Sequence, residues 1–268
     1  MDSASLARPV TKGTQIIMIS EMGFYPDKGY VLHGTVEEAI PWCKDMHIIP
    51  TVSIADPPYG DITSEEWDKA DINAWIQIIK EHEEWRCPIY WWGGIGKQNH
   101  RPFFEFILRV ENETHYRMRD LITWKKKRGY GKKKDYLFVR EECAFLTFHG
   151  NEVNTWNTPY LTEKRGYPGF NAKYPAKSEY YRRTNVWDET EILRNKLHPT
   201  QKASIVCQIP IDVHSNPKEV VLDLYSGSGE TSVQALKLGR AFIAIERKKE
   251  YAINICGRIE EILKHSTE

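Results

Sequence analysis

A strand–turn–helix–strand pattern near the carboxyl end constrains the fold of this 268-residue chain more than any other feature. Val220–Tyr225 is a continuous apolar run, typical of a strand that is buried on both faces of a parallel sheet. A glycine-rich turn and a helix that ends before Gly239 follow, and Ala241–Glu246 is the next apolar run. Because strands that alternate with helices favour crossover connections, the pattern predicts an α/β protein with a mostly parallel sheet.

The same alternation extends to earlier segments. Apolar, β-rich runs predict strands at Thr51–Ala55, Pro88–Trp92, Leu121–Trp124 and Ala144–Phe148. Helices are predicted after capping boxes at Thr35/Glu38 and Thr63/Glu66, the second leading into Trp67, and also at Phe103–Val110, Ala203–Pro210 and Tyr251–Leu263. Residues 1–30 lack clear periodicity, and Gly150–Asn195 reads as an irregular, loop-rich insert.

Charge and cysteine usage exclude several protein classes. Lys+Arg and Asp+Glu both total 37, so a globally basic nucleic-acid coat is excluded. Leu121–Lys202 nevertheless holds 17 basic against 9 acidic residues, which is typical of a local polyanion-binding face. The five cysteines form no C-x-x-C pair, so neither a disulfide scaffold nor a zinc cluster is expected, and a reducing compartment is favoured. We expect no signal peptide and no membrane span.

The glycine-rich turn is a candidate cofactor site. It reads Tyr225-Ser226-Gly227-Ser228-Gly229, and such glycines let the backbone turn tightly and approach a ligand at a helix amino terminus. Glu246 ends the next strand, where a carboxylate can accept hydrogen bonds from a ribose diol. This pattern favours a cofactor that contains adenosine, although a plain strand–helix turn has the same local sequence.

A second candidate site is the turn Asp56-Pro57-Pro58-Tyr59, which follows a predicted strand and so lies at the carboxyl edge of the sheet. Two prolines stiffen this turn. An exocyclic amine on a nucleobase is a poor nucleophile, and Asp56 together with the Pro57 carbonyl could accept its two hydrogens while Tyr59 stacks on the base. The alternative is a rigid surface turn.

Two other segments are weaker signals. His198-Pro199-Thr200-Gln201-Lys202 precedes a predicted helix, with Thr200 as a candidate cap and His198 ordering the local backbone. Trp91 and Trp92 lie beside Gly93-Gly94 and are expected in the core at a strand end, with a base pocket as the alternative.

The order D-P-P-Y, then H-P-T-Q-K, then D-L-Y-S-G-S-G-E-T-S, resembles the β-class of S-adenosylmethionine-dependent DNA amino-methyltransferases. In that family the catalytic motif precedes the cofactor motif. The resemblance extends from about His33 to the carboxyl end. It implies a Rossmann-like methyltransferase sheet with circularly permuted motif order and a small irregular target-recognition insert. It divides the chain into an arm (1–32), a catalytic half (33–149), a target-recognition region (150–195) and a cofactor-binding half (196–268).

The resemblance implies methyl transfer from S-adenosylmethionine to N6 of an adenine flipped out of DNA. Asp at the first motif position is similar to the adenine-N6 members, since cytosine-N4 members more often carry Ser there. The catalytic residues would be Asp56, Pro57, Pro58 and Tyr59. The cofactor would be held by Asp223, Tyr225, Ser226, Gly227, Ser228, Gly229, Thr231 and Glu246, with His198, Thr200 and Lys202 nearby. This chemistry requires no metal and no covalent intermediate.

The resemblance also implies DNA as the partner, a prokaryotic or phage-encoded cytoplasmic protein, and a homodimer as a plausible assembly. Phosphate contacts are predicted for a basic run at Lys125, Lys126, Lys127, Arg128, Lys132, Lys133 and Lys134. Backbone and base-edge contacts are predicted in the target-recognition region for Arg165, Lys173, Lys177, Arg182 and Arg183. A solvated polar loop is the alternative for both sets.

Three other functions stay open at this point. The acceptor could be cytosine N4 in DNA or adenine in RNA. A nicotinamide-dependent oxidoreductase could use Gly227, Gly229 and Glu246, but Ser232 stands where the third fingerprint glycine would be, and D-P-P-Y would be left unexplained. A non-catalytic nucleic-acid-binding relative is the third. Cytosine-C5 methylation is excluded, because the chain contains no Pro-Cys nucleophile.

Overall fold

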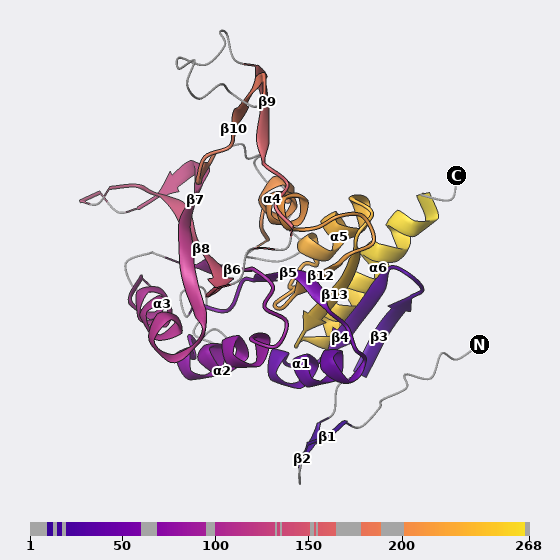
Figure 1. The fold of residues 1–268 in the computed structure, drawn as a ribbon. Helices are drawn as coiled ribbons and strands as arrows, with labels where there is room; N and C mark the ends of the chain where they lie inside the picture. The colour runs from indigo at the N-terminus through magenta and orange to yellow at the C-terminus, as the bar shows by residue number, and fades with distance from the viewer. Residues whose placement is uncertain are drawn as a thin grey trace.

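A mixed sheet forms the centre of the molecule (Figure 1). The computed structural model describes residues 10–12, 15–17, 20–59, 69–94, 100–131, 133–134, 136–150, 153, 155–164, 178–188 and 201–265. In spatial order, the nine strands of this sheet in the described residues are β11 (Val186–Trp187), β7 (Tyr116–Tyr130), β8 (Phe138–Phe148), β6 (Ile89–Gly93), β5 (Pro50–Ala55), β12 (Val220–Asp223), β13 (Ala241–Glu246), β4 (Gly29–His33) and β3 (Ser20–Tyr25).

The middle of the sheet is parallel and its two sides are not. Strands β6, β5, β12, β13 and β4 pair in parallel, so their carboxyl ends meet at one edge. Strand β8 pairs antiparallel with β6 and with β7, and β3 pairs antiparallel with β4. The α/β fold with a mostly parallel centre is thus confirmed.

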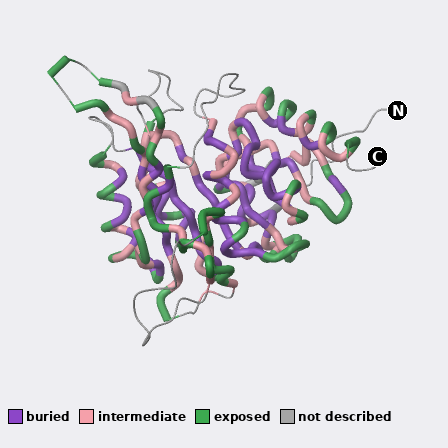
Figure 2. Tube along the Cα trace, turned by 90° about the horizontal axis from the view of Figure 1, so that it is seen from above, coloured by how far each residue is buried: buried purple, intermediate pink, exposed green. Residues whose placement is uncertain are grey.

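Helices cover both faces of the sheet, and each face has its own apolar cluster. One face carries α1 (Val36–Asp45), α2 (Ile72–His82) and α3 (His100–Glu113). The other carries α4 (Ser204–His214), α5 (Glu230–Lys237) and α6 (Lys249–His265). Figure 2 shows the result as buried positions through the centre of the molecule and exposed positions on its outer helices and loops. The three-layer arrangement fixes the sheet edge at which the loops between strands and helices gather.

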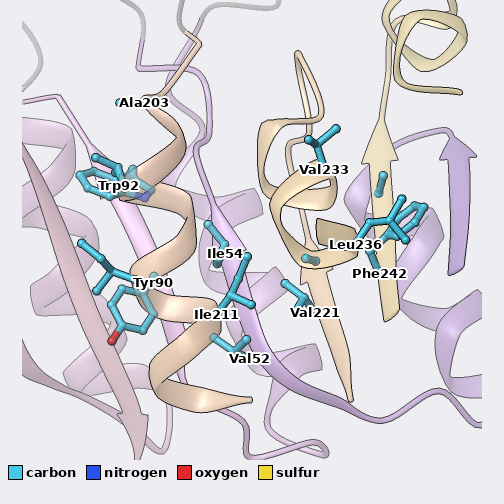
Figure 3. Packing of buried hydrophobic residues seen from close by; sticks show 14 of the residues in the cluster. Val52, Ile54, Tyr90, Trp92, Ala203, Ile211, Val221, Val233, Leu236 and Phe242 are labelled. Atoms are coloured by element: carbon cyan, nitrogen blue, oxygen red, sulfur yellow. The ribbon is translucent and has the colours of Figure 1, made fainter. Parts of the chain in front are cut away.

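Helix α4 is held over the middle of the sheet by apolar packing (Figure 3). Ile211 of this helix belongs to the same buried cluster as Val52 and Ile54 of β5 and Tyr90 of β6. The helix continues past Pro210 to His214, beyond the predicted end. Its first turn lies near the carboxyl ends of the parallel strands, so the packing also fixes Lys202, two residues before the helix.

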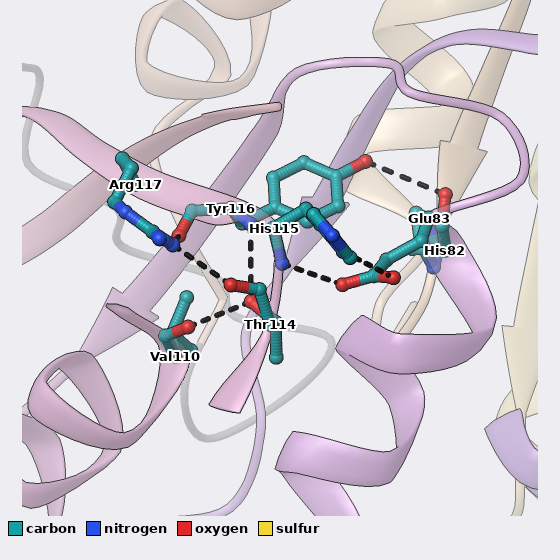
Figure 4. Close-up of polar contacts among 7 residues, drawn as sticks. All are labelled: His82, Glu83, Val110, Thr114, His115, Tyr116 and Arg117. Carbon is teal, nitrogen blue, oxygen red and sulfur yellow. Dashed lines mark hydrogen bonds and ion pairs between the residues drawn. The ribbon is translucent and has the colours of Figure 1, made fainter. Parts of the chain in front are cut away.

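The entry into β7 is fixed by hydrogen bonds at the end of α3 (Figure 4). Thr114 Oγ1 donates to the Val110 carbonyl at 2.7 Å and accepts from Tyr116 N–H at 3.1 Å. His115 N–H donates to Glu83 Oε1 at 2.6 Å, which ties the start of the strand to the end of α2. These bonds set where β7 begins.

The arm predicted for residues 1–32 differs from the structure over residues 20–32. Ser20–Tyr25 and Gly29–His33 form β3 and β4, with β3 at the edge of the sheet and β4 paired to β13 from Gly29 to His33. The pairing of β3 shifts register between Glu21 and Gly23, so the strand lacks the clean alternation that would reveal it in the sequence. Two short strands, β1 (Val10–Lys12) and β2 (Gln15–Ile17), pair with each other.

The irregular insert also contains strands that the sequence did not indicate. Strands β9 (Tyr160–Lys164) and β10 (Tyr180–Arg182) form an antiparallel pair, and β11 pairs in parallel with Thr123–Trp124 of β7. These strands are two to five residues long, too short for a period to show.

Two local predictions, the capping box before α1 and the glycine after α5, are confirmed. Thr35 and Glu38 form the capping box of α1. Gly239 follows α5 with φ of 76°. The predicted capping box at Thr63 and Glu66, and Trp67 with it, lies outside the described residues, and the helix after it begins at Ile72 with Asp71 as its cap. All five cysteines are free thiols. In the described part of the chain, no helix is long and apolar enough to cross a membrane, and no cluster of side chains suits a metal ion.

Candidate active site

A cavity of about 470 Å³ opens at the carboxyl ends of β5, β12 and β13. Its lining includes Asp56–Tyr59, which follows β5, and Tyr225–Ser228, which follows β12. Glu246 at the end of β13 and Lys202 before α4 complete it. Parallel strands bring these distant segments together at one edge, as the rule for ligand sites in α/β sheets expects.

The glycine-rich turn has the backbone that only glycine adopts readily. Gly227 and Gly229 have φ of 52° and 74°, in the left-handed region. A Cβ at Gly229 would lie 2.8 Å from the side chain of Ile255, so space as well as conformation requires glycine there. The turn therefore keeps its backbone close to α6 and leaves its other side to the cavity.

Glu246 is fixed by backbone donors. Gly227 N–H donates to Glu246 Oε2 at 2.8 Å, and Lys248 N–H donates to Oε1 at 2.7 Å. Each carboxylate oxygen keeps a second lone pair, so the group can still accept hydrogen bonds from a bound molecule. Burial raises the pKa of this carboxyl above its ordinary value, although the backbone donors oppose the shift.

Asp223 lies beneath the turn, buried at the end of β12. Burial raises the pKa of its carboxyl to about 7. Ser232 Oγ donates to Asp223 Oδ2 at 3.0 Å. Ser232, which stands where a dinucleotide-binding motif would have its third glycine, therefore holds this carboxyl.

Asp56 is held from two sides. The hydroxyl of Tyr59 donates to Asp56 Oδ1, and Lys202 Nζ donates to Oδ2 at 2.7 Å. Burial raises the pKa of the Tyr59 hydroxyl, and the neighbouring Asp56 charge adds to this, so Tyr59 stays a donor. With Pro57 and Pro58 between them, the carboxylate and the ring keep a fixed relation.

Lys202 connects this carboxylate to a second one. Its Nζ lies 2.9 Å from Glu141 Oε2 on β8, and the side chain is only 8% exposed. The ammonium also lies 5.1 Å from the centre of the Trp92 ring. Burial alone would lower the pKa of Lys202, but the charges of Asp56 and Glu141 outweigh it and raise the pKa above its ordinary value.

Glu141 was not indicated by any motif. Burial would raise the pKa of its carboxyl, but Lys202 and Lys126 together lower it to about 2. The Nζ of Lys126 on β7 forms an ion pair with Glu141 Oε1. This contact could be predicted only from the alternation of side chains along β7 and β8. That prediction requires the pairing register of the two strands, which the sequence does not provide.

Trp91 and Trp92 are both buried, as expected for core residues at a strand end. Trp92 also lines the cavity, so this residue can be part of the core and of a base pocket at the same time. Glu230 also lines the cavity, as does Thr231 beside it. The Oε1 atom of Glu230 accepts from Ser204 Oγ at 2.8 Å and its Oε2 atom accepts from Arg258 at 2.7 Å, so this carboxylate joins α4, α5 and α6.

The predicted DNA-contacting residues divide into three groups. Lys125, Lys127, Lys133 and Lys134 are exposed on the β7–β8 hairpin, whereas Lys126 is paired with Glu141. Arg182 and Arg183 line a second cavity of about 370 Å³ together with Arg119. The side chain of Arg128 and the residues Lys132, Arg165, Lys173 and Lys177 lie outside the described residues. His198 and Thr200, which were predicted near the cofactor, lie outside them as well.

Comparisons with known proteins agree with this arrangement. A family described as DNA methylase, of the N6/N4 type, matches residues 51–255. The chain is 35% identical over 267 residues to DNA adenine methyltransferase YhdJ of Escherichia coli, covering 89% of this chain and 85% of that protein. The chain belongs to the N6/N4 DNA methylase family.

Other members are similar at greater distance. Type II methyltransferase M1.MboII of Moraxella bovis is 25% identical over 230 residues, covering 75% of this chain and 85% of that protein. Among solved structures, the M1.HpyAVI–SAM complex has a TM-score of 0.63 at 21% identity, covering 87% of this chain and 98% of that one. The cytosine-N4-specific PvuII DNA methyltransferase has a TM-score of 0.61 at 14% identity, covering 86% of each chain. At these identities the structures show the DNA methylase fold.

Proposed function

We propose that this DNA methylase transfers a methyl group from S-adenosylmethionine to N6 of an adenine that is flipped out of DNA. The observation that carries the proposal is one cavity lined by Asp56, by Gly227 of the glycine-rich turn and by Glu246. Its volume of about 470 Å³ lies in the range of small-molecule sites. A methyl donor and an acceptor base can therefore meet in one cavity.

The residues beside the glycine-rich turn fit the cofactor. Glu246 has free lone pairs at the position suited to a ribose diol, and the left-handed turn at Gly227 allows a close approach of the backbone. The solved M1.HpyAVI–SAM complex, a relative in fold, contains this cofactor. We assign Glu246 to the ribose and the Tyr225–Gly229 turn, with Asp223 and Thr231, to the rest of the cofactor.

On the opposite side, Asp56 suits the acceptor amine. Its two oxygens accept from Tyr59 and Lys202 and still have lone pairs for an N–H of the base. The Pro57 carbonyl would accept the second N–H, and the Tyr59 ring would stack on the purine. Both acceptors orient the nitrogen and stabilise the positive charge that develops on it.

When bound, S-adenosylmethionine would supply a sulfonium-linked methyl group, so that the new N–C bond would form as the C–S bond breaks and its electron pair leaves on sulfur. The amino nitrogen would then carry a positive charge and lose one proton, for which Asp56 is the adjacent acceptor. The protein's own part is thus to align the amine, exclude water and receive the proton.

Two observations favour adenine over cytosine as the acceptor. Asp56 occupies the first motif position, where the adenine-N6 members carry Asp, and the 35% identical relative from E. coli is named a DNA adenine methyltransferase. The PvuII enzyme, which is cytosine-N4-specific, shares the fold alone.

The test is methyl transfer from labelled cofactor to duplex DNA, followed by nucleoside analysis of the product. We expect N6-methyladenine from the wild-type protein and a large loss with Asp56→Ala. A cofactor-binding titration on the same variant checks that the cavity remains intact. N4-methylcytosine as the product would overturn the adenine assignment, and undiminished transfer by Asp56→Ala would overturn the role of Asp56. Acceptance of RNA but not DNA would overturn the substrate class.

A further inference from the structure

The basic run on β7 is not one uniform surface. Successive side chains of a strand point to opposite faces, so Lys126 points away from the side taken by Lys125 and Lys127. Lys125 and Lys127 are exposed, whereas Lys126 is partly buried and paired with Glu141. Neighbouring lysines in one sequence motif therefore have different surroundings.

The inward lysine is the first member of a chain of ion pairs that leads to the reacting centre. Lys126 contacts Glu141 Oε1, and Glu141 Oε2 lies 2.9 Å from Lys202 Nζ. Lys202 Nζ in turn lies 2.7 Å from Asp56 Oδ2. The Lys126–Glu141–Lys202–Asp56 chain, hereafter the ion-pair chain, links two strands, the segment before α4 and the D-P-P-Y turn.

Aromatic rings hold the two ammonium groups in place. Lys126 Nζ lies 5.1 Å and Lys202 Nζ 6.0 Å from the centre of the Trp124 ring. The Trp92 ring lies 5.1 Å from Lys202 Nζ. Side chains packed in this way have few alternative positions, so a change in the position of one ion pair also moves the neighbouring pair.

We propose that Glu141 and Lys126 are positioning residues for Asp56, acting through Lys202, and that Lys126 is not a DNA phosphate contact. The inference rests on the proposed function, because Asp56 must be the acceptor for the amine. It gives Lys126 a role other than phosphate contact, and it adds Glu141, which belongs to no motif, to the residues that support the reaction.

The physical reason is the sharing of one ammonium between two carboxylates. Glu141 takes part of the charge of Lys202 and keeps its Nζ at one side of Asp56, so the remaining lone pairs of Asp56 stay available to the base. Without Glu141, Lys202 would keep Asp56 as its single charged partner among the described contacts and could move over the face that the amine needs. Lys126 offsets the second charge of the buried pair, because an unbalanced buried carboxylate would be costly.

The experiment compares Glu141→Gln and Lys126→Met with Lys127→Met, a neighbour on the opposite face of the same strand. Steady-state kinetics give kcat and the KM for DNA, and binding at several salt concentrations gives the salt slope. For Glu141→Gln we expect kcat to fall about 10- to 100-fold with little change in the KM for DNA, as for loss of an electrostatic positioning contact. For Lys126→Met we expect a smaller fall in kcat and an unchanged salt slope.

The control should behave in the opposite way. Lys127→Met should raise the KM for DNA and lower the salt slope by about 0.9, the value for one lost phosphate contact. Lys126→Arg keeps the charge and should restore most of kcat. Thermal unfolding and cofactor binding check the fold of Glu141→Gln, and Lys126→Met provides a second readout if that variant fails to fold.

Two results would overturn the proposal. One is a Lys126→Met variant that behaves like Lys127→Met in salt slope while keeping its kcat. The other is a folded Glu141→Gln variant with wild-type kcat. Either would leave N6-methyladenine formation by the wild type intact, whereas failure of the wild type to methylate DNA would instead overturn the proposed function.

Discussion

On the side of the cavity next to the glycine-rich turn, Asp223, Gly227 and Glu246 all belong to one strand–helix–strand unit. On the opposite side, Asp56 and Lys202 line the cavity, and Glu141 and Lys126 lie behind them. These four residues come from four segments that meet only in the folded protein. The first side is held by backbone donors and glycine conformation, and the second by side-chain charges. A local unit can keep its geometry when one residue changes, whereas an ion-pair network shares its energy among all of its members.

The difference implies that substitutions on the two sides should have different kinetic signatures. Changes near Glu246 should act on cofactor binding and leave the chemistry of the bound complex intact. Changes in the ion-pair chain should act on the chemical step and be non-additive, because its members have partners in common.

The largest effect is expected from Asp56→Asn, which keeps the shape of the side chain and removes its charge. We expect kcat to fall by about 100- to 1,000-fold, the usual loss for a group that stabilises charge in the transition state. The dissociation constant for the cofactor should stay within about twofold, because Asp56 lies on the other side of the cavity. Single-turnover kinetics and a binding titration measure the two quantities. A parallel loss of cofactor affinity would show that the two sides are not separable.

A smaller and opposite pattern is expected from Glu246→Ala. Loss of a charged hydrogen-bond acceptor should raise the KM for the cofactor about 10- to 100-fold. At saturating cofactor, kcat should change much less than for Asp56→Asn. A cofactor titration with fixed DNA measures this, and a kcat loss at unchanged KM would remove Glu246 from the cofactor side.

The contrast between a local unit and a network from four segments also explains which parts of the site could be predicted from the sequence. The glycine-rich turn and the Asp56 turn are contiguous strings at strand ends, so chemistry and placement could both be predicted from the order of elements. Glu141 sits in a strand beside a run of lysines and has no motif, and its pairing depends on the register of β7 with β8. The basic run follows the predicted strand Leu121–Trp124, and alternation is hard to see among consecutive charges, so the sequence does not show that β7 continues to Tyr130.

The parts of the fold that were missed have a related cause. Strand β3 lies at one edge of the sheet beside β4, and its pairing has a register irregularity. Strand β11, at the other edge, has two residues. Short or irregular strands carry little periodicity, so tertiary pairing alone defines them. Lys202 was assigned to the cofactor by its motif, whereas its closest described partners are Asp56 and Glu141.

On the cofactor side, Asp223 predicts a pH dependence of stability. Burial raises its pKa from 3.8 to about 7, so the folded protein binds this proton more tightly than the unfolded chain. The resulting contribution to stability is present at low pH and is lost as the pH rises through about 7. Between about pH 5 and about pH 8, the free energy of unfolding of the wild type should fall by about 2 kcal/mol more than that of Asp223→Asn. Urea unfolding of both proteins at the two pH values measures the difference, and parallel curves would contradict the raised pKa.

The smallest effect is expected outside the cavity, on the exposed tip of the β7–β8 hairpin. Lys133 and Lys134 are exposed there, and as phosphate contacts each would contribute about 0.9 to the salt slope of DNA binding. The double variant Lys133→Gln/Lys134→Gln should therefore bind DNA several-fold more weakly at moderate salt, with a slope lower by about 1.8. Because both ammonium groups lie outside the ion-pair chain, kcat at saturating DNA should not follow this change. Titration of labelled duplex at several salt concentrations tests the point. An unchanged slope would mean that Lys133 and Lys134 are solvated and make no phosphate contact.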